Sequence, residues 1–204
     1  MYEQFSHSIL NEILDQLRPE LKEQELSHFY TRLGANFYSL FSLFYKLYGR
    51  RSDFKAQLLR LVEVMAYQYI GRSPEFKQTD LVREKNFNWF LESQWVGMTL
   101  YADGFADDLQ DLGDRVAYFS ELGVNFIHIM PILECPRHAS DGGYAISNYR
   151  QINPKIGTLQ DLQHLVEIFR QKEILLALDI VINHTSNEHE WAQKARKGDK
   201  KYQK

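Results

Sequence analysis

The chain has 204 residues, a formal net charge of −3, and 44% hydrophobic and 14% aromatic residues, a composition typical of folded globular proteins rather than disordered ones. A slightly acidic chain lacks the basic surplus needed to neutralise phosphates, so we expect no nucleic-acid partner. The only cysteine, Cys135, cannot form an internal disulfide and has no convincing base beside it, which predicts a packed side chain rather than a nucleophile. With no signal peptide or membrane-length apolar run visible, we expect a cytoplasmic protein with no membrane partner.

Residues 1–90 show helical periodicity and no strand signal. Apolar residues three and four positions apart predict three helices, with faces formed by Ile9, Leu10, Ile13, Leu14 and Leu17, by Phe37, Leu40, Phe41, Phe44 and Leu47, and by Leu58, Leu61, Val62, Met65 and Tyr69. Pro19 interrupts the first pattern, and Ser73 followed by Pro74 predicts the start of another helix. The aromatic stripe from Tyr30 to Tyr48 is open to two interpretations, a ligand site or a helical core, and the periodicity favours the core. We predict an all-helical N-terminal domain over residues 1–90.

Residues 91–204 follow a different pattern, in which apolar runs alternate with helical segments. We predict strands at 96–101, 124–130 and 174–182, a helix at 112–122 ended by Gly123, and a helix that begins at a Thr158–Asp161 capping box. Apolar runs without alternation are typical of strands buried on both faces, as in parallel sheets. The order strand–helix–strand–helix–strand predicts an α/β architecture, either a doubly wound sheet or the start of a (β/α)8 TIM barrel.

The first predicted strand is not followed by a glycine-rich phosphate loop, since Gly104 and Gly113 lack the required spacing. This argues against a dinucleotide-binding fold. In both remaining architectures the functional face lies at the carboxyl ends of the strands. Two segments follow predicted strands there and carry candidate site residues.

The first segment is the connection 131–157, which is far longer than the usual two to six residues and is therefore a candidate functional loop. It contains Asp141, Gly142, Gly143 and Tyr144. The glycines permit a tight turn, the Asp accepts hydrogen bonds from hydroxyl groups, and the Tyr ring offers an apolar face to a sugar. The alternative is a plain Asp-Gly turn with a packed tyrosine, and the local sequence leaves both open.

The second segment is the end of the third predicted strand, where Asp179 is followed by Asn183 and His184. A carboxylate within an apolar strand needs a partner, and an imidazole at the functional face can donate to a ligand oxygen. An Asp–His pair that only fastens a loop explains the same residues equally well. We expect no metal site, because the spacing of His184, Glu188 and His189 is poor and His189 is expected to face solvent on the next helix. We interpret His128, in the second strand, as a barrel-interior or core residue.

These motifs together resemble the amylosucrases of the α-amylase superfamily, glycoside hydrolase family 13. The sequence from Asp179 to Thr185 resembles the family's strand-three motif, and the segments 140–145, 184–191 and 101–109 resemble amylosucrases in particular. One departure is visible before strand three, where the family usually has glycine and this chain reads Gln171-Lys172-Glu173. The resemblance spans essentially the whole chain and implies a helical N-terminal domain, residues 1–90, before the first three β/α units of a (β/α)8 TIM barrel, residues 91–204.

The resemblance implies a retaining glucosyl transferase that cleaves sucrose and extends an α-1,4-glucan, without a cofactor. Asp141, Tyr144 and His184 match the substrate-binding residues of this family: the pocket-floor carboxylate, the platform beneath the glucosyl ring, and the donor to the hydroxymethyl oxygen. Asp179 matches a supporting carboxylate. Asn183 matches a supporting position that ligates calcium in many amylases, although we expect no metal here.

In this family the nucleophile, the acid/base and the stabilising carboxylate follow strands four, five and seven. We therefore expect the 204 residues to be a truncated form with no catalytic residues of its own, inactive alone and prone to associate through an open sheet edge. Two alternatives remain: a fragment of a sucrose or α-glucan hydrolase, and a non-catalytic helical interaction module.

Overall fold

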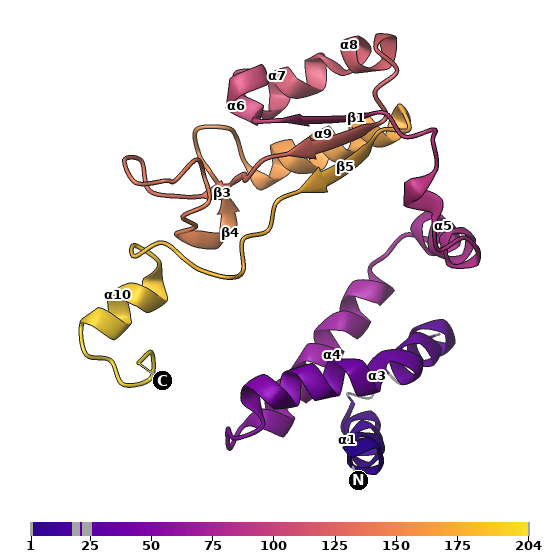
Figure 1. Ribbon diagram of the computed structural model, residues 1–204, viewed down its shortest axis with the longest axis vertical. Coiled ribbons are helices and arrows are strands. Elements are labelled where there is room, and N and C mark those ends of the chain that lie inside the picture. Colours follow the sequence, from indigo (N-terminus) through magenta and orange to yellow (C-terminus); the bar gives the residue numbers. More distant parts are fainter. Residues whose placement is uncertain (1, 18–20, 22–25, 204) are drawn as a thin grey trace. The chain divides into compact units, whose positions relative to one another are not determined.

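The computed structural model describes residues 2–17, 21 and 26–203. The chain divides into two compact units, residues 1–87 and 88–204 (Figure 1). In the part of the chain that the structure describes, no helix is both long and apolar enough to cross a bilayer.

The first unit contains helices only, among its described residues. They are α1 (Tyr2–Gln16), α3 (Ser27–Tyr48), α4 (Phe54–Ile70) and α5 (Pro74–Lys85). The buried residues of α3 recur every fourth position, at Phe29, Leu33, Phe37 and Phe41, and they pack with α1 and α4 into one hydrophobic core. The interpretation of the aromatic stripe as a helical core is therefore confirmed for Phe37 and Phe41. It is wrong for Tyr38 and Tyr48, which are exposed, and for Leu47 of the predicted face, which is 72% exposed. The predicted interruption at Pro19 lies outside the described residues.

The second unit alternates strands and helices in the predicted order. Its elements are η1 (Trp89–Leu91), β1 (Gly97–Leu100), α6 (Ala102–Phe105), α7 (Leu109–Asp114), α8 (Val116–Glu121), β2 (Phe126–Ile129), β3 (Leu133–Glu134), β4 (Asn148–Ile152), α9 (Leu159–Gln171), β5 (Leu175–Leu178) and α10 (Glu190–Arg196). The strands β1, β2 and β5 form a parallel sheet in that order, so the prediction of three parallel strands is confirmed.

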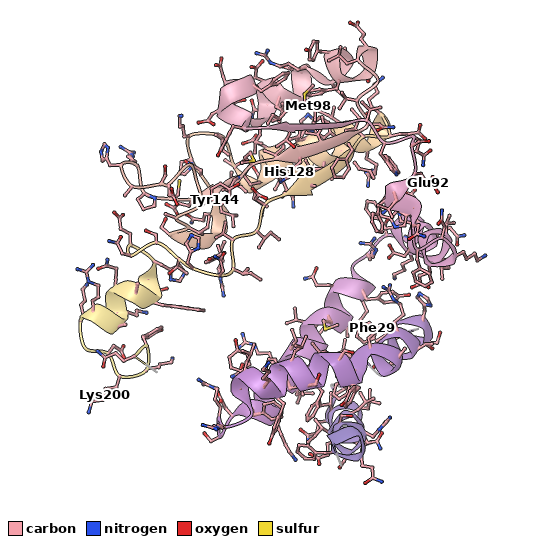
Figure 2. The ribbon with its side chains drawn as sticks, in the orientation of Figure 1. Phe29, Glu92, Met98, His128, Tyr144 and Lys200 are labelled. Carbon is pink, nitrogen blue, oxygen red and sulfur yellow. The ribbon has the colours of Figure 1, made fainter. Side chains whose placement is uncertain are left out.

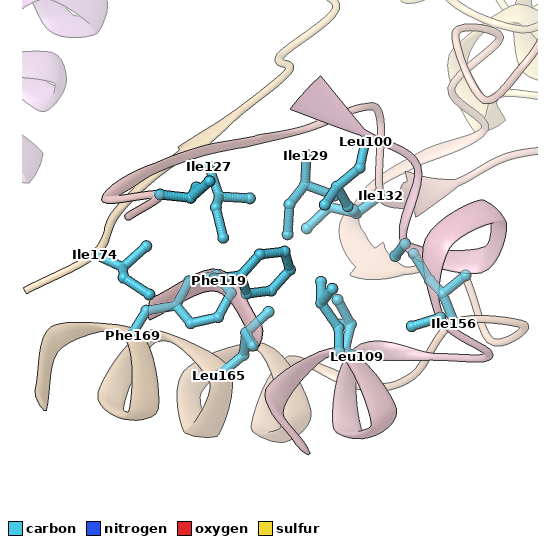
Figure 3. Close-up of a cluster of buried hydrophobic side chains, with 14 of the residues drawn as sticks. Leu100, Leu109, Phe119, Ile127, Ile129, Ile132, Ile156, Leu165, Phe169 and Ile174 are labelled. Carbon is cyan, nitrogen blue, oxygen red and sulfur yellow. The ribbon is translucent and has the colours of Figure 1, made fainter. Parts of the chain in front are cut away.

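One face of this sheet packs against helices. Ile127 and Ile129 of β2 are fully buried in a core that includes Phe119 of α8 and Phe169 of α9 (Figure 3). Because side chains alternate along a strand, His128 projects from the opposite face of the sheet. The helix-facing side of the sheet is therefore an ordinary hydrophobic core, and the polar chemistry belongs to the other face.

Three sequence predictions need correction. The third strand ends at Leu178 rather than continuing to 182, so Asp179 lies just beyond it instead of within it. The single helix expected at 112–122 is two helices, α7 and α8, which meet at Arg115. The long connection is not simply a loop, because it contains the antiparallel strands β3 and β4, whose pairing is irregular between Leu133 and Glu134. Apolar periodicity does not mark the places where hydrogen bonding stops, so these boundaries could not be found from it.

The turn chemistry agrees with the sequence. Thr158 and Asp161 form a reciprocal capping box at the start of α9, and the side chain of Ser73 accepts from the Phe76 amide at the start of α5. Gly123 has a φ of 73°, the left-handed conformation predicted for it after α8. Glu173 also has a positive φ, 57°, in the turn where the family usually has glycine.

Candidate functional site

The carboxyl end of the parallel sheet brings together a tyrosine, a carboxylate and a histidine. The Tyr144 hydroxyl donates to Asp179 Oδ2 at 2.8 Å, and His128 Nε2 lies 3.0 Å from Asp179 Oδ1. Figure 2 labels His128 within the sheet and Tyr144 beyond its carboxyl end, on the side of the β3–β4 hairpin. Tyr144 reaches Asp179 from the long connection 131–157, so residues 35 positions apart meet where β5 ends.

The ionisation of this group follows from its geometry. The hydrogen bond to Asp179, together with desolvation and the negative charge of Asp179, raises the pKa of Tyr144 to about 12. The hydrogen bond from Tyr144 lowers the pKa of Asp179, against the opposing effect of desolvation, and His128 lowers it further. At neutral pH the cluster of Tyr144, Asp179 and His128 therefore contains an ionised Asp179 and a neutral Tyr144, and the Tyr144 hydroxyl proton is donated to Asp179.

The turn that carries Tyr144 depends on its two glycines. Asp141, Gly142 and Gly143 all have positive φ, at 51°, 65° and 93°. A Cβ on Gly143 would lie 3.2 Å from the Pro131 carbonyl oxygen, and one on Gly142 would lie 3.2 Å from the Tyr101 hydroxyl. The chain thus reverses tightly against the end of β2 and points Tyr144 back at the sheet, while Asp141 stays exposed at the tip of the turn.

The segment after β5 carries the other predicted residues, Asn183 and His184, both of which have exposed side chains. This segment is attached to the hairpin by the side chain of Tyr149 and by one main-chain hydrogen bond. The Tyr149 hydroxyl lies 2.6 Å from the carbonyl oxygen of Val181 and 3.0 Å from that of His184, and the Ser186 amide donates to Ile146 at 2.8 Å. The segment that carries His184 therefore lies against Ile146 and Tyr149, which follow the turn of Asp141 along the chain. That their side chains act together with Tyr144 stays a prediction.

The expectation that His189 faces solvent is wrong. Its side chain is only 8% exposed, and its Nδ1 accepts from the Trp191 amide as the cap of α10. The ring also packs against Tyr149, with centroids 5.7 Å apart. His189 is buried because α10 begins at this residue and the hairpin lies against it, which is a contact made at long range in the sequence.

A separate cleft of about 670 Å³ is lined in part by the 140–143 turn, through Ser140, Gly142 and Gly143. Its walls include Tyr101, Asp103, Cys135 and Lys155, and Lys155 and Asp103 form an ion pair at 2.6 Å. Tyr144, Asp179 and His128 do not line it, so this cleft is distinct from the cluster at the strand ends. Burial raises the pKa of Cys135, which agrees with the interpretation of this residue as a packed thiol rather than a nucleophile.

Sequence reasoning did not assign two of the residues that build this arrangement to the site. His128 was interpreted only as an interior or core residue, yet a single imidazole in an otherwise apolar strand that ends at the functional face was a usable signal. Tyr149 carried no such signal, because its partner Val181 lies 32 residues away.

Residues 75–204 match the family described as alpha amylase, catalytic domain. An oligo-1,6-glucosidase of Bacillus cereus is 35% identical over 124 residues, which cover 55% of this chain and 22% of that protein. Maltase 1 of Drosophila virilis is 32% identical over 145 residues, covering 68% of this chain and 22% of that protein. Among solved structures, an isomaltulose synthase from Erwinia rhapontici in complex with its natural substrate sucrose is 32% identical, covers 50% of this chain and 19% of its own, and has a TM-score of 0.46.

The chain thus spans about a fifth of the length of these curated relatives. The matched region contains all three strands of the parallel sheet and every residue of the cluster formed by Tyr144, Asp179 and His128. The chain belongs to the alpha-amylase family and carries part of its catalytic domain.

Proposed function

We propose that this chain provides part of the glucosyl-binding site of a retaining enzyme that acts on sucrose, of the amylosucrase type. The observation that carries the proposal is the hydrogen bond from Tyr144 to Asp179 at the carboxyl end of the sheet. The Tyr144 hydroxyl is directed at the Asp179 carboxylate, so the tyrosine ring is held in place and the faces of the ring serve as the contact surface for a sugar. Aromatic faces of this kind pack against the C–H side of a sugar ring.

Two neighbouring side chains complete the proposed recognition of the sugar. Asp141 is exposed at the tip of the turn, where it accepts hydrogen bonds from glucosyl hydroxyls. His184 is exposed on the neighbouring loop, where its ring donates to the hydroxymethyl oxygen. The hydrogen bonds from the Tyr149 hydroxyl and the Ser186 amide support this pairing, because they hold the segment of His184 against the chain that follows the turn of Asp141. Asp179 and Asn183 have supporting rather than contacting roles.

A hydrolytic enzyme acting on α-glucosides is the second candidate function. It is favoured by the curated relatives, which carry the names of an oligo-1,6-glucosidase and a maltase. Transfer and hydrolysis share the glucosyl site and differ in what accepts the sugar from the enzyme. The proposed roles of Asp141, Tyr144 and His184 are the same in both functions.

The direct test is ligand binding at Tyr144. The chain is labelled with 13C at the tyrosine rings and titrated with sucrose and with glucose, and the Tyr144 signal is identified by its loss in Tyr144→Phe. We expect shifts at Tyr144 with weak, millimolar-range affinity, because few groups contact the sugar and association itself is costly. Tyr144→Ala, Asp141→Ala and His184→Ala should abolish or weaken the effect. Tyr38→Ala, which changes an exposed tyrosine of the helical unit, is the matched control.

The outcome that rejects the proposal is a sugar response that is unchanged in Tyr144→Ala, or no response at Tyr144 at saturating sucrose.

A separate expectation concerns turnover. Retaining chemistry needs a nucleophile and an acid/base about 5 Å apart. Of the two carboxylates of the proposed site, Asp179 is engaged by Tyr144 and His128, which leaves Asp141 without a second free carboxylate there. We therefore expect the 204-residue chain alone to release no glucose or fructose from sucrose above background, and release that disappears in Asp141→Ala would contradict this expectation.

A further inference from the structure

His128 is the one histidine of the parallel sheet, and it lies on the face that the helices do not cover. Its neighbours in the strand, Ile127 and Ile129, are fully buried against α8 and α9. Its register partners are Thr99 on β1 and Ala177 on β5, so it occupies the middle of the sheet. A core role does not account for this position, because the imidazole projects away from the packed helices.

The contacts of His128 lead to the proposed sugar platform. Its Nε2 lies 3.0 Å from Asp179 Oδ1, while the other oxygen of the same carboxylate accepts from Tyr144 at 2.8 Å. An ionised carboxylate only accepts hydrogen bonds, so the proton of this contact must be on Nε2. The remaining nitrogen, Nδ1, faces the Thr99 hydroxyl at 3.5 Å, a long contact.

A carboxylate with a donor on each oxygen has its plane fixed. Asp179 is the first residue after β5, where its amide makes only a long hydrogen bond of 3.4 Å to the Ile129 oxygen of β2, and its side chain is 26% exposed. With Tyr144 as its only partner, the carboxylate could rotate and carry the tyrosine hydroxyl with it. The second donor comes from β2, a strand paired on both sides, and it therefore ties the carboxylate to the most firmly held part of the sheet.

We propose that His128 is a positioning residue of the glucosyl site, which holds the Asp179 carboxylate from Nε2 and through it orients the ring of Tyr144. His128 does not contact the sugar. The inference rests on the proposed function for the role of Tyr144, but the relay from His128 to Tyr144 is a property of the chain without ligand. The effect of His128 on Tyr144 distinguishes the proposed role from that of a histidine that only stabilises a loop. Replacement of such a histidine would leave the Tyr144 hydroxyl unaffected.

The first measurement uses the unaltered chain. Nitrogen-15 spectra of labelled histidine distinguish the two neutral tautomers, and the His128 signal is assigned by its loss in His128→Gln. We expect His128 to carry its proton on Nε2. A proton on Nδ1 alone, with Nε2 bare, would overturn the proposal because Asp179 could not then accept from the ring.

The second measurement follows the Tyr144 hydroxyl at neutral pH through the deuterium isotope effect on its 13Cζ signal. In His128→Phe, which keeps an aromatic ring but removes the donor, we expect hydroxyl exchange to accelerate about tenfold, the loss of roughly one hydrogen bond. His128→Gln, whose amide can donate toward Asp179, should restore slow exchange, and His128→Asn, whose amide is too short, should not. His164→Gln, an exposed histidine of α9, is the matched control.

The ionisation of Tyr144 should also differ between these variants at about pH 10.5, where circular dichroism verifies that each variant is still folded. A tyrosine with a pKa of about 12 stays protonated there, whereas one near the ordinary value of about 10 is mostly ionised. We expect Tyr144 to be more ionised in His128→Phe and His128→Asn than in the parent chain. Unchanged Tyr144 exchange and ionisation in both folded variants would overturn the proposal.

The sugar titration described above separates the two hypotheses. If Tyr144 responds to His128 but sucrose and glucose do not perturb Tyr144, the relay exists and the proposed function fails. If sugars perturb Tyr144 equally in the parent chain and in His128→Phe, the function stands and the positioning role fails. If His128→Phe does not fold, the comparison of His128→Gln with His128→Asn decides the same question.

Discussion

The hydroxyl of Tyr149 donates a 2.6 Å hydrogen bond to the main-chain oxygen of Val181, which joins strand β4 to the segment that follows β5. The same hydroxyl lies 3.0 Å from the oxygen of His184, the last residue of the strand-three motif. One side chain of the long connection therefore fixes the path of the segment that carries His184, one of the predicted sugar-binding residues. This segment has no strand partner of its own, so its position depends on contacts of this kind.

Replacement of Tyr149 by phenylalanine should loosen this segment. The change leaves the carbonyl of the buried residue Val181 without its donor, and one neutral hydrogen bond contributes about 1 kcal/mol. We expect faster amide hydrogen exchange at Ser186, whose amide donates to Ile146, and a loss of about 1 kcal/mol in the free energy of unfolding. Tyr118→Phe, an exposed tyrosine of α8, is the control. Equal Ser186 exchange in the two variants would show that Tyr149 does not hold the segment.

Acid should weaken the cluster through Asp179. Its pKa is lowered in the folded chain, mainly by the hydrogen bond from Tyr144, so its contribution to stability is present above about pH 4 and is lost as the pH falls through the lowered value. The stability difference between the parent chain and Asp179→Asn should therefore shrink on acidification. Urea unfolding at a series of pH values measures this difference, with Asp114→Asn as a control for the removal of one charge. A difference that grows at low pH would contradict the assignment.

Glu173 should be replaceable by glycine with a gain in stability. Its φ of 57° is costly for a residue with a side chain, by about 1–2 kcal/mol, while glycine adds an entropic cost of about 0.5–1 kcal/mol. The net expectation for Glu173→Gly is a gain of about 0.5–1 kcal/mol in the free energy of unfolding. Lys172→Gly, at a residue with φ of −106°, should be neutral or destabilising. Chemical denaturation measures the free energy of unfolding of the two variants. A loss of stability in Glu173→Gly would show that the turn is not strained.

The segment after β5 should promote self-association. Ile180 and Ile182 are 71% and 84% exposed, and β5 pairs only with β2 among the described strands. A free strand edge next to exposed isoleucines is a template for intermolecular pairing. Ile182→Lys should therefore reduce the apparent mass in light scattering, whereas Leu159→Lys, at an isolated exposed residue of α9, should not. A monodisperse monomer in the parent chain would refute this expectation.

The sequence by itself determined the elements whose causes are local. Helical spacing predicted part of the core face of α3, at Phe37 and Phe41. The Thr158–Asp161 pair predicted the start of α9, and Gly123 predicted the left-handed residue after α8. The apolar runs predicted three parallel strands. The motifs around Tyr144 and Asp179 led to the alpha-amylase family, which the comparison then showed, while the amylosucrase type stays a proposal. The helix faces, the capping box and the individual strands each depend on residues only a few positions apart, where backbone geometry and side-chain spacing decide the outcome.

Only the tertiary structure decided how the site is assembled. The contact of Tyr144 with Asp179 joins residues 35 positions apart, and that of His128 with Asp179 joins residues 51 apart. Contacts with distant residues also explain two corrected predictions: His189, expected to be exposed, packs against Tyr149, and the third strand, expected to continue, ends at Leu178, the register partner of the last residue of β2. An apolar run shows that a segment can be buried, but the partners that bury it or end its pairing come from other elements, and no local pattern records them.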